Sequence, residues 1–236
     1  MTDITFNQIP DTERTPGVYT EFDTATAVRT LASNPQSVVL LAQRLSTAAY
    51  KDNEAVPVFS DDQAAALFGR GSQAHLMTRA AIKAYRYLQL AVMPLDDDKT
   101  AGIAATTTIT LTGPSTGTGQ NSVWIMGQRI DVATTSGLDA TAMGTRLASA
   151  INGNKDLPVT ASAAAGVVTL TARNKGTWGN EFAVRTATTV PGATITTAAG
   201  TAGAGNPDIT PALAAIFGAG FTVVVAPFSD ADTLDA

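Results

Sequence analysis

The sequence predicts an α/β core that is split in two by an inserted β-rich α+β domain. Three observations carry this prediction: an unbroken apolar run at residues 37–43, a similar run at residues 222–226, and a change of composition between them. Unbroken apolar runs rich in β-branched residues are typical of strands that are covered on both faces. Between them, residues 101–206 hold fifteen of the twenty glycines and little charge. The simplest interpretation is one α/β domain whose two pieces flank a different fold.

These changes of composition divide the chain into four segments. Residues 1–36 form an extended N-terminal arm, residues 37–98 the first part of the α/β core, residues 99–206 the inserted domain with one helix, and residues 207–236 the resumed core. An α/β unit normally continues from a strand into a further helix, so an end just after the last strand indicates a truncated core. We expect a fragment of a longer protein.

The bulk composition excludes several function classes. Only 15% of the residues are charged and the net charge is -5, so the chain offers no basic surface for nucleic acid. The absence of cysteine rules out disulfides and thiolate chemistry. The N-terminus lacks the basic start and apolar run of a signal peptide, and Val38 to Ala42 is far shorter than the roughly 20 residues that cross a bilayer. We expect neither a nucleic-acid partner nor a membrane segment.

Within the arm, prolines at positions 10, 16 and 35 disfavour a helix or a central strand. Directly after Gly17, apolar and polar side chains alternate with the period of a strand, which could pair with another chain. A disordered leader is the alternative. The residues predicted to form this inter-subunit strand are Val18, Tyr19, Thr20, Glu21 and Phe22.

The first α/β segment is predicted to run strand, helix, helix, strand. Residues 37–43 form a central strand, Ser60 and Gln63 make a capping box for a short helix that ends at Gly69, and residues 88–93 form the second strand. If the two strands are parallel neighbours, a right-handed crossover joins them. Between them, residues 73–87 form a helix with an inward face of Leu76, Met77, Ala80, Ala84, Tyr87 and Leu88.

The inserted domain is predicted to combine several strands with a single helix. That helix runs from about Asp139 to Asn152, with Met143, Leu147 and Ile151 on one stripe and a cap at Asp139 or Thr141. Residues 189–206 are rich in Gly, Ala and Thr and indicate a loop or returning linker. The predicted strands are Thr106–Thr112, Val123–Ala133, Val159–Ala163, Val167–Ala172 and Phe182–Thr188.

From Pro207 the α/β character returns. Thr210 is the expected cap of a helix, Pro211 occupies its first turn, and Gly218 or Gly220 ends it. The apolar face of this helix is predicted to comprise Leu213, Ile216 and Phe217. A buried strand, Thr222–Ala226, follows.

No pattern in the sequence predicts catalysis or a cofactor site. The single histidine, His75, lies in a helical pattern, and the chain holds no G-x-S-x-G turn. Residues 113–119 lack the lysine of a phosphate-binding loop and are interpreted as a hairpin loop. Asp96, Asp97 and Asp98 are adjacent and cannot all converge on one ion, so we interpret them as a solvated domain junction rather than a metal site.

Two further pairs of residues leave alternatives open. Asp230 and Asp232 follow the last strand, at the end where open α/β sheets bind ligands, but contacts to a missing part of the protein would explain them equally well. Trp124 and Trp178 are interpreted as packing aromatics, and a sugar-binding platform is the alternative.

Particular segments resemble a known family. FNQIP at residues 6–10 and RTPGVYTEF at residues 14–22 resemble the opening of tail sheath proteins of Mu-like phages. VTASAAAGVVTLTARNKGTWGN at residues 159–180 is similar to the inserted domain of that family, and residues 209–230 resemble the point where the sheath core resumes. Together these segments cover most of the chain.

The resemblance implies a structural subunit, not an enzyme, with no cofactor and no metal. Full-length sheath proteins stack as hexameric rings around a tail tube, and their contraction drives the tube through the host envelope. The implied partners are other sheath subunits, the tail tube protein, the baseplate and the tail terminator. The implied location is the virion tail, with assembly in the host cytoplasm. A surface-displayed or carbohydrate-binding β-domain protein is the alternative, and a hydrolase would need residues that this chain lacks.

Overall fold

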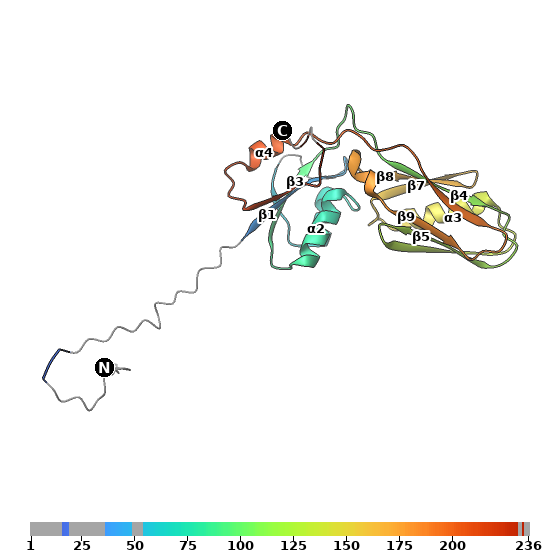
Figure 1. Cartoon of the computed structure of the whole chain (residues 1–236), viewed down its shortest axis with the longest axis horizontal. Coiled ribbons are helices and arrows are strands. Elements are labelled where there is room, and N and C mark those ends of the chain that lie inside the picture. Colours follow the sequence, from blue (N-terminus) through green and yellow to red (C-terminus); the bar gives the residue numbers. More distant parts are fainter. Residues whose placement is uncertain (1–15, 19–35, 49–53, 231–232, 234–236) are drawn as a thin grey trace. The chain divides into compact units, whose positions relative to one another are not determined.

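The computed structural model describes residues 16–18, 36–48, 54–230 and 233. The chain divides between Pro35 and Gln36 into two units, and only residues 16–18 of the first are described. In the second unit the described residues form a mixed α/β fold with four α-helices and three sheets (Figure 1). None of these described helices has the length and apolar character that a bilayer span requires.

The first sheet is built from both ends of the second unit, in the order β11-β1-β3-β2. Strand β1 (Ser37–Gln43) lies parallel to β3 (Gln89–Leu95) on one side and to β11 (Val223–Val225) on the other. The short strand β2 (Val56–Pro57) pairs antiparallel with β3. The three strands predicted here are present, and the first two are parallel neighbours, an arrangement that the sequence left open. Strand β2 was not predicted.

Alternate residues of β1 enter two different cores, as the two-residue period of a strand requires. Val38 and Leu40 pack with α1 (Asp61–Phe68) and α2 (Gln73–Ala84) on one face. Val39 and Leu41 pack with α4 (Thr210–Ile216) on the other. We call β1–β3, β11, α1, α2 and α4 the α/β part.

The helix ends of the α/β part follow local signals, with small differences from the prediction. Ser60 Oγ accepts from Gln63 N as predicted, whereas Gln63 Oε1 accepts from Phe59 N, one residue before the cap. Gly69 ends α1 with a φ of 90°, which favours glycine. At α4 the cap position is Ile209 rather than the predicted Thr210, which is the first helical residue, and Asp208 Oδ1 accepts from Thr210 N.

The predicted inward face of α2 was partly wrong. The helix ends at Ala84 rather than Tyr87, and the predicted inward residues Ala80, Ala84 and Tyr87 are exposed. The fully buried side chains of α2 include His75 and Thr78. These two polar residues can be buried because Thr78 Oγ1 donates to Ala74 O and the His75 ring is bonded on both nitrogens.

The other two sheets are antiparallel. One has the order β10-β4-β8-β7 and the other the order β6-β5-β9. We call these seven strands, together with α3 (Ala140–Gly153), the β-rich part. Its strands are β4 (Thr106–Thr112), β5 (Gly119–Ile125), β6 (Gln128–Thr134), β7 (Val159–Ala164), β8 (Val167–Ala172), β9 (Val184–Thr188) and β10 (Thr194–Ala199).

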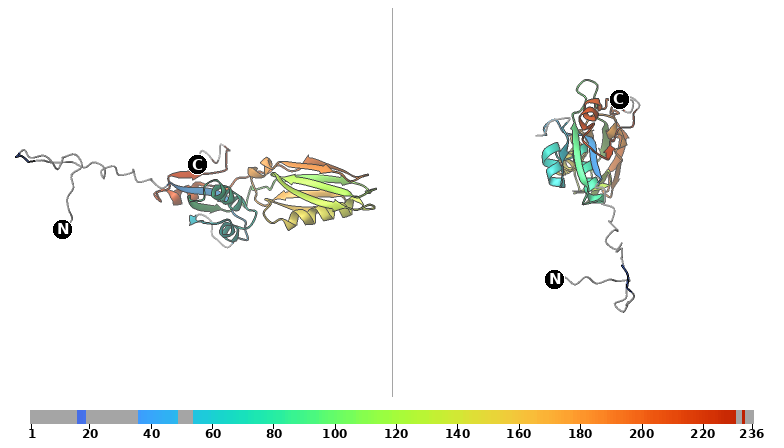
Figure 2. Two further views of the ribbon diagram at one scale, coloured as in Figure 1. Left: turned by 90° about the horizontal axis from the view of Figure 1, so that it is seen from below. Right: turned by 90° about the vertical axis from the view of Figure 1, so that its left-hand side faces the viewer.

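Both sheets and α3 share one core. The helix begins at the predicted cap, where Asp139 Oδ1 accepts from Ala142 N, and its Met143, Leu147 and Ile151 are buried as predicted. They pack with Ile109 of β4 and Val123 of β5, which belong to different sheets. Figure 2 shows α3, in yellow, lying along the strands.

Three predictions about the β-rich part were wrong. The predicted strand at residues 123–133 is two strands, β5 and β6, joined by a tight turn in which Met126 and Gly127 have φ of 48° and 79°. Residues 189–206 contain β10, which pairs with β4. Residues 113–119 join β4 to β5, strands of different sheets, and so do not form a hairpin loop.

Two predictions about the end of the chain were also wrong. Strand β11 was expected to be buried, but its three valines are 38%, 47% and 38% exposed because β11 lies at the edge of its sheet. Phe217 was expected on the apolar face of α4, but it follows the last helical residue and is 92% exposed.

Candidate functional site

The α/β part and the β-rich part meet at a buried cluster of amide and carboxyl side chains, which we call the amide cluster (Gln43, Gln73, Asp97 and Asn174). Asn174, in the loop after β8, is fully buried. Its Oδ1 accepts from Gln73 N at 3.0 Å, and its Nδ2 donates to Arg44 O at 2.9 Å and to Asp97 Oδ1 at 3.0 Å. One side chain of the β-rich part therefore satisfies three groups of the α/β part and of the segment that leaves it.

Asp97 is held by donors from both parts. Its Oδ1 also accepts from Gln43 Nε2 at 2.9 Å, and its Oδ2 accepts from Lys175 N at 3.1 Å. Burial raises the pKa of Asp97, and the hydrogen bond from Asn174 acts in the opposite direction. The sequence placed Asp97 at a domain junction, but its expected solvation was wrong, since this carboxyl group is largely enclosed.

A second network of charged groups, the ion-pair cluster (Asp61, Arg70, His75, Arg79 and Asp156), also joins the two parts. Asp156 lies in the turn between α3 and β7, and its carboxylate pairs with Arg70 at 3.0 Å and with Arg79 at 3.1 Å. Arg79 in turn binds Asp61 at the start of α1. The hydrogen bond from Arg79 lowers the pKa of Asp61, which therefore stays ionised.

His75 completes the ion-pair cluster from within α2. Its Nδ1 accepts from Gly71 N at 3.1 Å, which leaves the proton on Nε2, 3.0 Å from Asp61 Oδ1. Burial, followed by the charge of Arg79, lowers the pKa of His75 and favours this neutral form. Ser72 Oγ is occupied by the backbone N–H of His75. The ring is thus fully bonded and has no free nitrogen with which to act as a base.

A close backbone approach brings the two parts together beside these clusters. Gly71 has a φ of 82°, and a Cβ placed on it would lie 2.5 Å from Leu157 O and 2.7 Å from Lys155 O. Both the conformation and the lack of space require glycine at this position.

The three adjacent aspartates do not share one ligand. Asp96 pairs with Arg44 at 2.6 Å, Asp97 enters the amide cluster, and Asp98 Oδ1 accepts from the backbone N–H groups of Thr100 and Ala101. Within the described ranges no group of three or more His, Cys, Asp or Glu side chains has the arrangement of a metal site.

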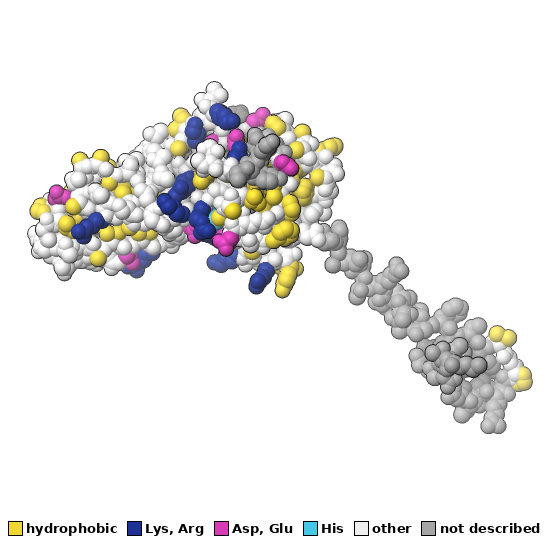
Figure 3. Space-filling model, turned by 180° about the vertical axis from the view of Figure 1, so that it is seen from behind, with side chains coloured by type: hydrophobic (Ala, Val, Ile, Leu, Met, Phe, Trp, Pro, Cys, Tyr) yellow, Lys and Arg dark blue, Asp and Glu magenta, His cyan; other side chains and the backbone are white. Residues whose placement is uncertain are grey.

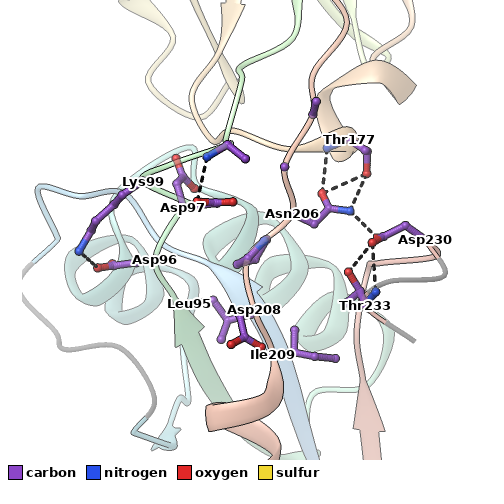
Figure 4. A pocket seen from close by; sticks show the side chains of 15 residues that line it. Leu95, Asp96, Asp97, Lys99, Thr177, Asn206, Asp208, Ile209, Asp230 and Thr233 are labelled. Atoms are coloured by element: carbon purple, nitrogen blue, oxygen red, sulfur yellow. Dashed lines mark hydrogen bonds and ion pairs between the residues drawn. The ribbon is translucent and has the colours of Figure 1, made fainter. Parts of the chain in front are cut away.

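A hollow of about 800 Å³ lies where the chain passes between the two parts (Figure 4). Asp230 lies on its wall, beyond β11, and accepts from Asn206 Nδ2 and from Thr233 Oγ1. Asn206 also binds Thr177 of the β-rich part through Oδ1 and Nδ2. Asp230 thus holds the returning segment in place, while Asp232 lies outside the described residues.

Both tryptophans lie in the β-rich part and make different contacts. Trp178 packs edge-to-face against Phe182 with ring centroids 4.7 Å apart, in agreement with the packing interpretation. Trp124 of β5 has the guanidinium carbon of Arg129 5.3 Å from its ring centroid and lines a separate hollow of about 490 Å³.

Of the predicted inter-subunit strand, the structure describes only the first residue, Val18. Val18 is 95% exposed and forms no part of a strand. Tyr19, Thr20, Glu21 and Phe22 lie outside the described residues, so the proposed role of this segment stays a prediction.

Comparison with known proteins links this chain to phage tails. No family model matches it. The Mu-like prophage FluMu tail sheath protein of Haemophilus influenzae is 36% identical to it over 239 aligned residues, which include 98% of this chain. The chain is homologous to a Mu-like tail sheath protein. The resemblance found in the sequence is thereby confirmed, and the chain spans about half, 48%, of the length of that relative.

Solved structures give a weaker likeness. The sheath tail protein Lin1278 from Listeria innocua is 16% identical, with a TM-score of 0.31 over 89% of this chain and 44% of that chain. A chain of Mycobacterium phage Patience is 15% identical, with a TM-score of 0.24 over 41% of this chain and 37% of that chain. At TM-scores this low, neither carries an argument about this fold.

The amide cluster and the ion-pair cluster were not predicted. Their members are separated by up to 131 positions, from Gln43 to Asn174, and no local pattern marks them. The available signals were polar residues in otherwise apolar surroundings, such as Gln43 at the end of an unbroken apolar strand and Gln73 at the start of a helix. Buried polar groups need partners, and here some of the partners come from the other part: Gln43 Nε2 donates to Lys175 O, and Gln73 N donates to Asn174 Oδ1.

Proposed function

We propose that this chain is part of the sheath subunit of a contractile phage tail and acts as a structural component. The observation that carries this proposal is the 36% identity to a Mu-like prophage tail sheath protein, which extends over nearly the whole chain. In this role the complete subunit stacks as hexameric rings around the tail tube. Contraction of the stack drives the tube through the host envelope.

The proposed partners are other sheath subunits, the tail tube protein, the baseplate and the tail terminator. The proposed location is the virion tail, reached after assembly in the host cytoplasm. No cofactor or catalytic step enters this role. Its support is the full hydrogen bonding of His75, which leaves that ring no free nitrogen, together with the separate uses of Asp96, Asp97 and Asp98.

We also propose the domain division that the sequence suggests. It consists of an arm at residues 1–36, an α/β core at residues 37–98 and 207–236, and an inserted domain at residues 99–206. The support is the sheet pairing, in which β11 lies beside β1 although all seven strands of the β-rich part intervene in the sequence. The separate apolar core of the β-rich part adds to it.

The distribution of exposed apolar side chains supports an assembly role for the α/β part. Scattered apolar residues are normal on a protein surface, whereas a concentration of large ones indicates an interaction site. Figure 3 shows apolar side chains gathered on the α/β part. The large exposed ones there are Phe59, Tyr85, Tyr87, Phe217, Val223, Val224 and Val225.

Strand β11 lies at the edge of its sheet with no partner on its outer side among the described residues, which also supports an assembly role. An exposed, apolar edge strand can accept a further strand, and natural proteins normally block such edges with charge or cover them. Residues 223–225 are three valines with no charge among them. We therefore propose that sequence outside this chain covers β11 in the complete sheath.

For the arm, we propose that residues 18–22 donate a strand to a neighbouring subunit. In the full-length protein, removing residues 1–23 should abolish sheath polymers without unfolding the subunit. Val18→Pro or Thr20→Pro should have the same effect, because proline fixes φ and removes a backbone donor. Sheaths of normal length from either variant would eliminate strand donation.

Electron microscopy of the full-length gene product tests the proposed function. We expect polymeric sleeves or stacked rings. Monodisperse monomers that bind glycans would instead favour the alternative of a surface-displayed or carbohydrate-binding protein.

A further inference from the structure

A row of three large side chains crosses the outward face of the sheet β6-β5-β9. In the strand register, Trp124 of β5 lies directly opposite Arg129 of β6 and Arg185 of β9. The residues on either side of Trp124, Val123 and Ile125, are fully buried in the core of the β-rich part. Because side chains alternate along a strand, Trp124 and both arginines point away from that core.

The two arginines of this row differ in their partners. Arg129 lies over the indole of Trp124, and its Nε is 2.8 Å from Asp131 Oδ1, so its charge is locally balanced. Arg185 is exposed and has no ion pair or side-chain hydrogen bond among the described residues. The row therefore presents one uncompensated positive charge next to an aromatic ring.

The same residues border a hollow. Trp124 and Arg185 line a cavity of about 490 Å³ together with Gly127, Ala183 and Thr186. This volume falls within the range of small-ligand sites, roughly 300 to 1,000 Å³. The space above Gly127 is open, since a Cβ placed there would meet no atom within 4 Å. An aromatic ring and a guanidinium with no partner among the described residues thus lie together on one concave surface.

From this arrangement we propose that the hollow binds a sugar that carries a carboxylate, such as a uronic acid residue of a surface polysaccharide. The apolar C–H face of a pyranose ring packs on the indole of Trp124. Its carboxylate accepts two parallel hydrogen bonds from the guanidinium of Arg185, whose planar fork matches a carboxylate. This proposal goes beyond the sheath function and does not depend on it.

A purely structural explanation accounts for only part of the row. Cation–π contact with Arg129 stabilises Trp124 on the sheet surface. It does not explain why a second arginine, which has no acidic partner among the described residues, lies on the other side of the same ring in a chain whose net charge is -5. An acidic peptide would satisfy Arg185, but it would gain less from the ring and the hollow than a sugar does.

Titration of the chain with trigalacturonate, followed by NMR, tests the proposal. The two tryptophans give two indole N–H signals, and Trp124→Ala identifies which belongs to Trp124. We expect trigalacturonate to shift this signal and to leave that of Trp178 unchanged. Arg185→Ala should weaken binding at least tenfold. Arg146→Ala is the matched control, because Arg146 is an exposed arginine on α3, and it should change nothing.

Three results would overturn the proposal: no shift of the Trp124 signal at millimolar trigalacturonate, equal binding of the neutral sugar maltotriose, or equal binding of a glutamate hexapeptide. The second result would show that the site does not recognise the carboxylate, and the third would show that it recognises negative charge alone. If Trp124→Ala does not fold, comparing Arg185→Ala with Arg146→Ala still tests the proposal, because both side chains are exposed and their removal should leave the chain folded.

Discussion

The α/β part and the β-rich part bury their apolar side chains in different ways. In the β-rich part, two sheets and α3 enclose one core, and its large apolar side chains exposed to solvent are Ile103 and Met126. The α/β part has a core on each face of its sheet, yet its described residues expose seven large apolar side chains and leave one apolar edge unpaired. We therefore call the β-rich part closed, because its large apolar side chains are mostly enclosed, and the α/β part open, because many of its large apolar side chains face solvent.

The two parts therefore differ in how they gain their stability. The β-rich part resembles an independent domain, with its own core and antiparallel hairpins that pair locally. The α/β part resembles one side of an interface, because large exposed apolar residues mark surfaces that are covered by other chains or segments. The polar contacts between the parts fix their connection but leave the open surface free for assembly.

The most drastic test separates the two parts. Residues 99–206 expressed alone should melt cooperatively, because the core around Leu147 lies entirely within them. Joining Asp98 to Asp208 with a short linker should leave the α/β part folded, but less stable, since it loses the contacts of Asn174 and Asp156. A non-cooperative melt and collapsed amide dispersion in NMR spectra of residues 99–206 would show that the parts depend on each other for folding.

The amide cluster can be tested by one substitution. Asn174→Ala leaves Gln73 N, Arg44 O and Asp97 Oδ1 each short of a hydrogen bond, and a buried polar group without its partner costs about 1 to 3 kcal/mol. We expect the free energy of unfolding in urea to fall by about 3 kcal/mol. The matched control is Asn180→Ala, an exposed asparagine with two bonds to Gly203, which should cost about 1 kcal/mol. Equal losses would mean that the cluster does not stabilise the contact.

The two clusters should also respond to pH with opposite signs. Burial raises the pKa of Asp97 above 3.8, so between pH 3.8 and the raised value the folded protein keeps a proton that the unfolded chain releases. The contribution of Asp97 to the free energy of unfolding therefore falls as the pH rises through this window. The pKa of Asp61 is lowered, first by its hydrogen bond to Arg79, so its contribution is present above pH 3.8 and is lost as the pH falls below that value.

Urea unfolding of Asp97→Asn and Asp61→Asn at several pH values measures these contributions. In the parent chain, Asp97 makes the free energy of unfolding fall as the pH rises, and Asp97→Asn should remove this fall. Asp61 makes the free energy of unfolding rise with pH, and Asp61→Asn should remove this rise. If the free energy of unfolding changes with pH in the same way for the parent chain and for Asp97→Asn, the burial of this carboxyl group is contradicted.

The smallest effect is expected at the open surface. Phe217→Ser should change the free energy of unfolding by no more than about 0.5 kcal/mol, because the side chain is 92% exposed and supports no core contact. Phe68→Ser, in a fully buried residue of α1, is the contrasting variant and should cost more than about 3 kcal/mol. A large loss for Phe217→Ser would show that this part of the surface is covered within the chain.

The sequence predicted the elements whose signals are local. Strand β1 and helix α3 were correct in position and in inward face, because unbroken β-branched runs and the stripe of Met143, Leu147 and Ile151 determine them. The cap at Asp139 was equally local. These features need only the period of the apolar residues and the chemistry of the helix ends.

The sequence did not predict features that depend on distant partners. Strand β10 is composed mainly of Thr and Ala, and only its pairing with β4, more than 80 residues away, distinguishes it from a loop. Strand β11 has the composition of a buried strand, but its place at the sheet edge depends on the strand order. Asn174 gives no local signal of its role, because its partners Arg44, Gln73 and Asp97 lie in the α/β part and the segment that leaves it.

Amide hydrogen exchange tests most directly the claim that one part is open and the other closed. Exchange should be measured for this chain alone and for a full-length sheath protein that contains it, assembled into sleeves. We predict that protection rises on assembly at residues 217–225 and around Tyr87, and stays unchanged along β4 to β10. A gain of protection confined to the β-rich part, with residues 217–225 still exchanging freely, would contradict the account.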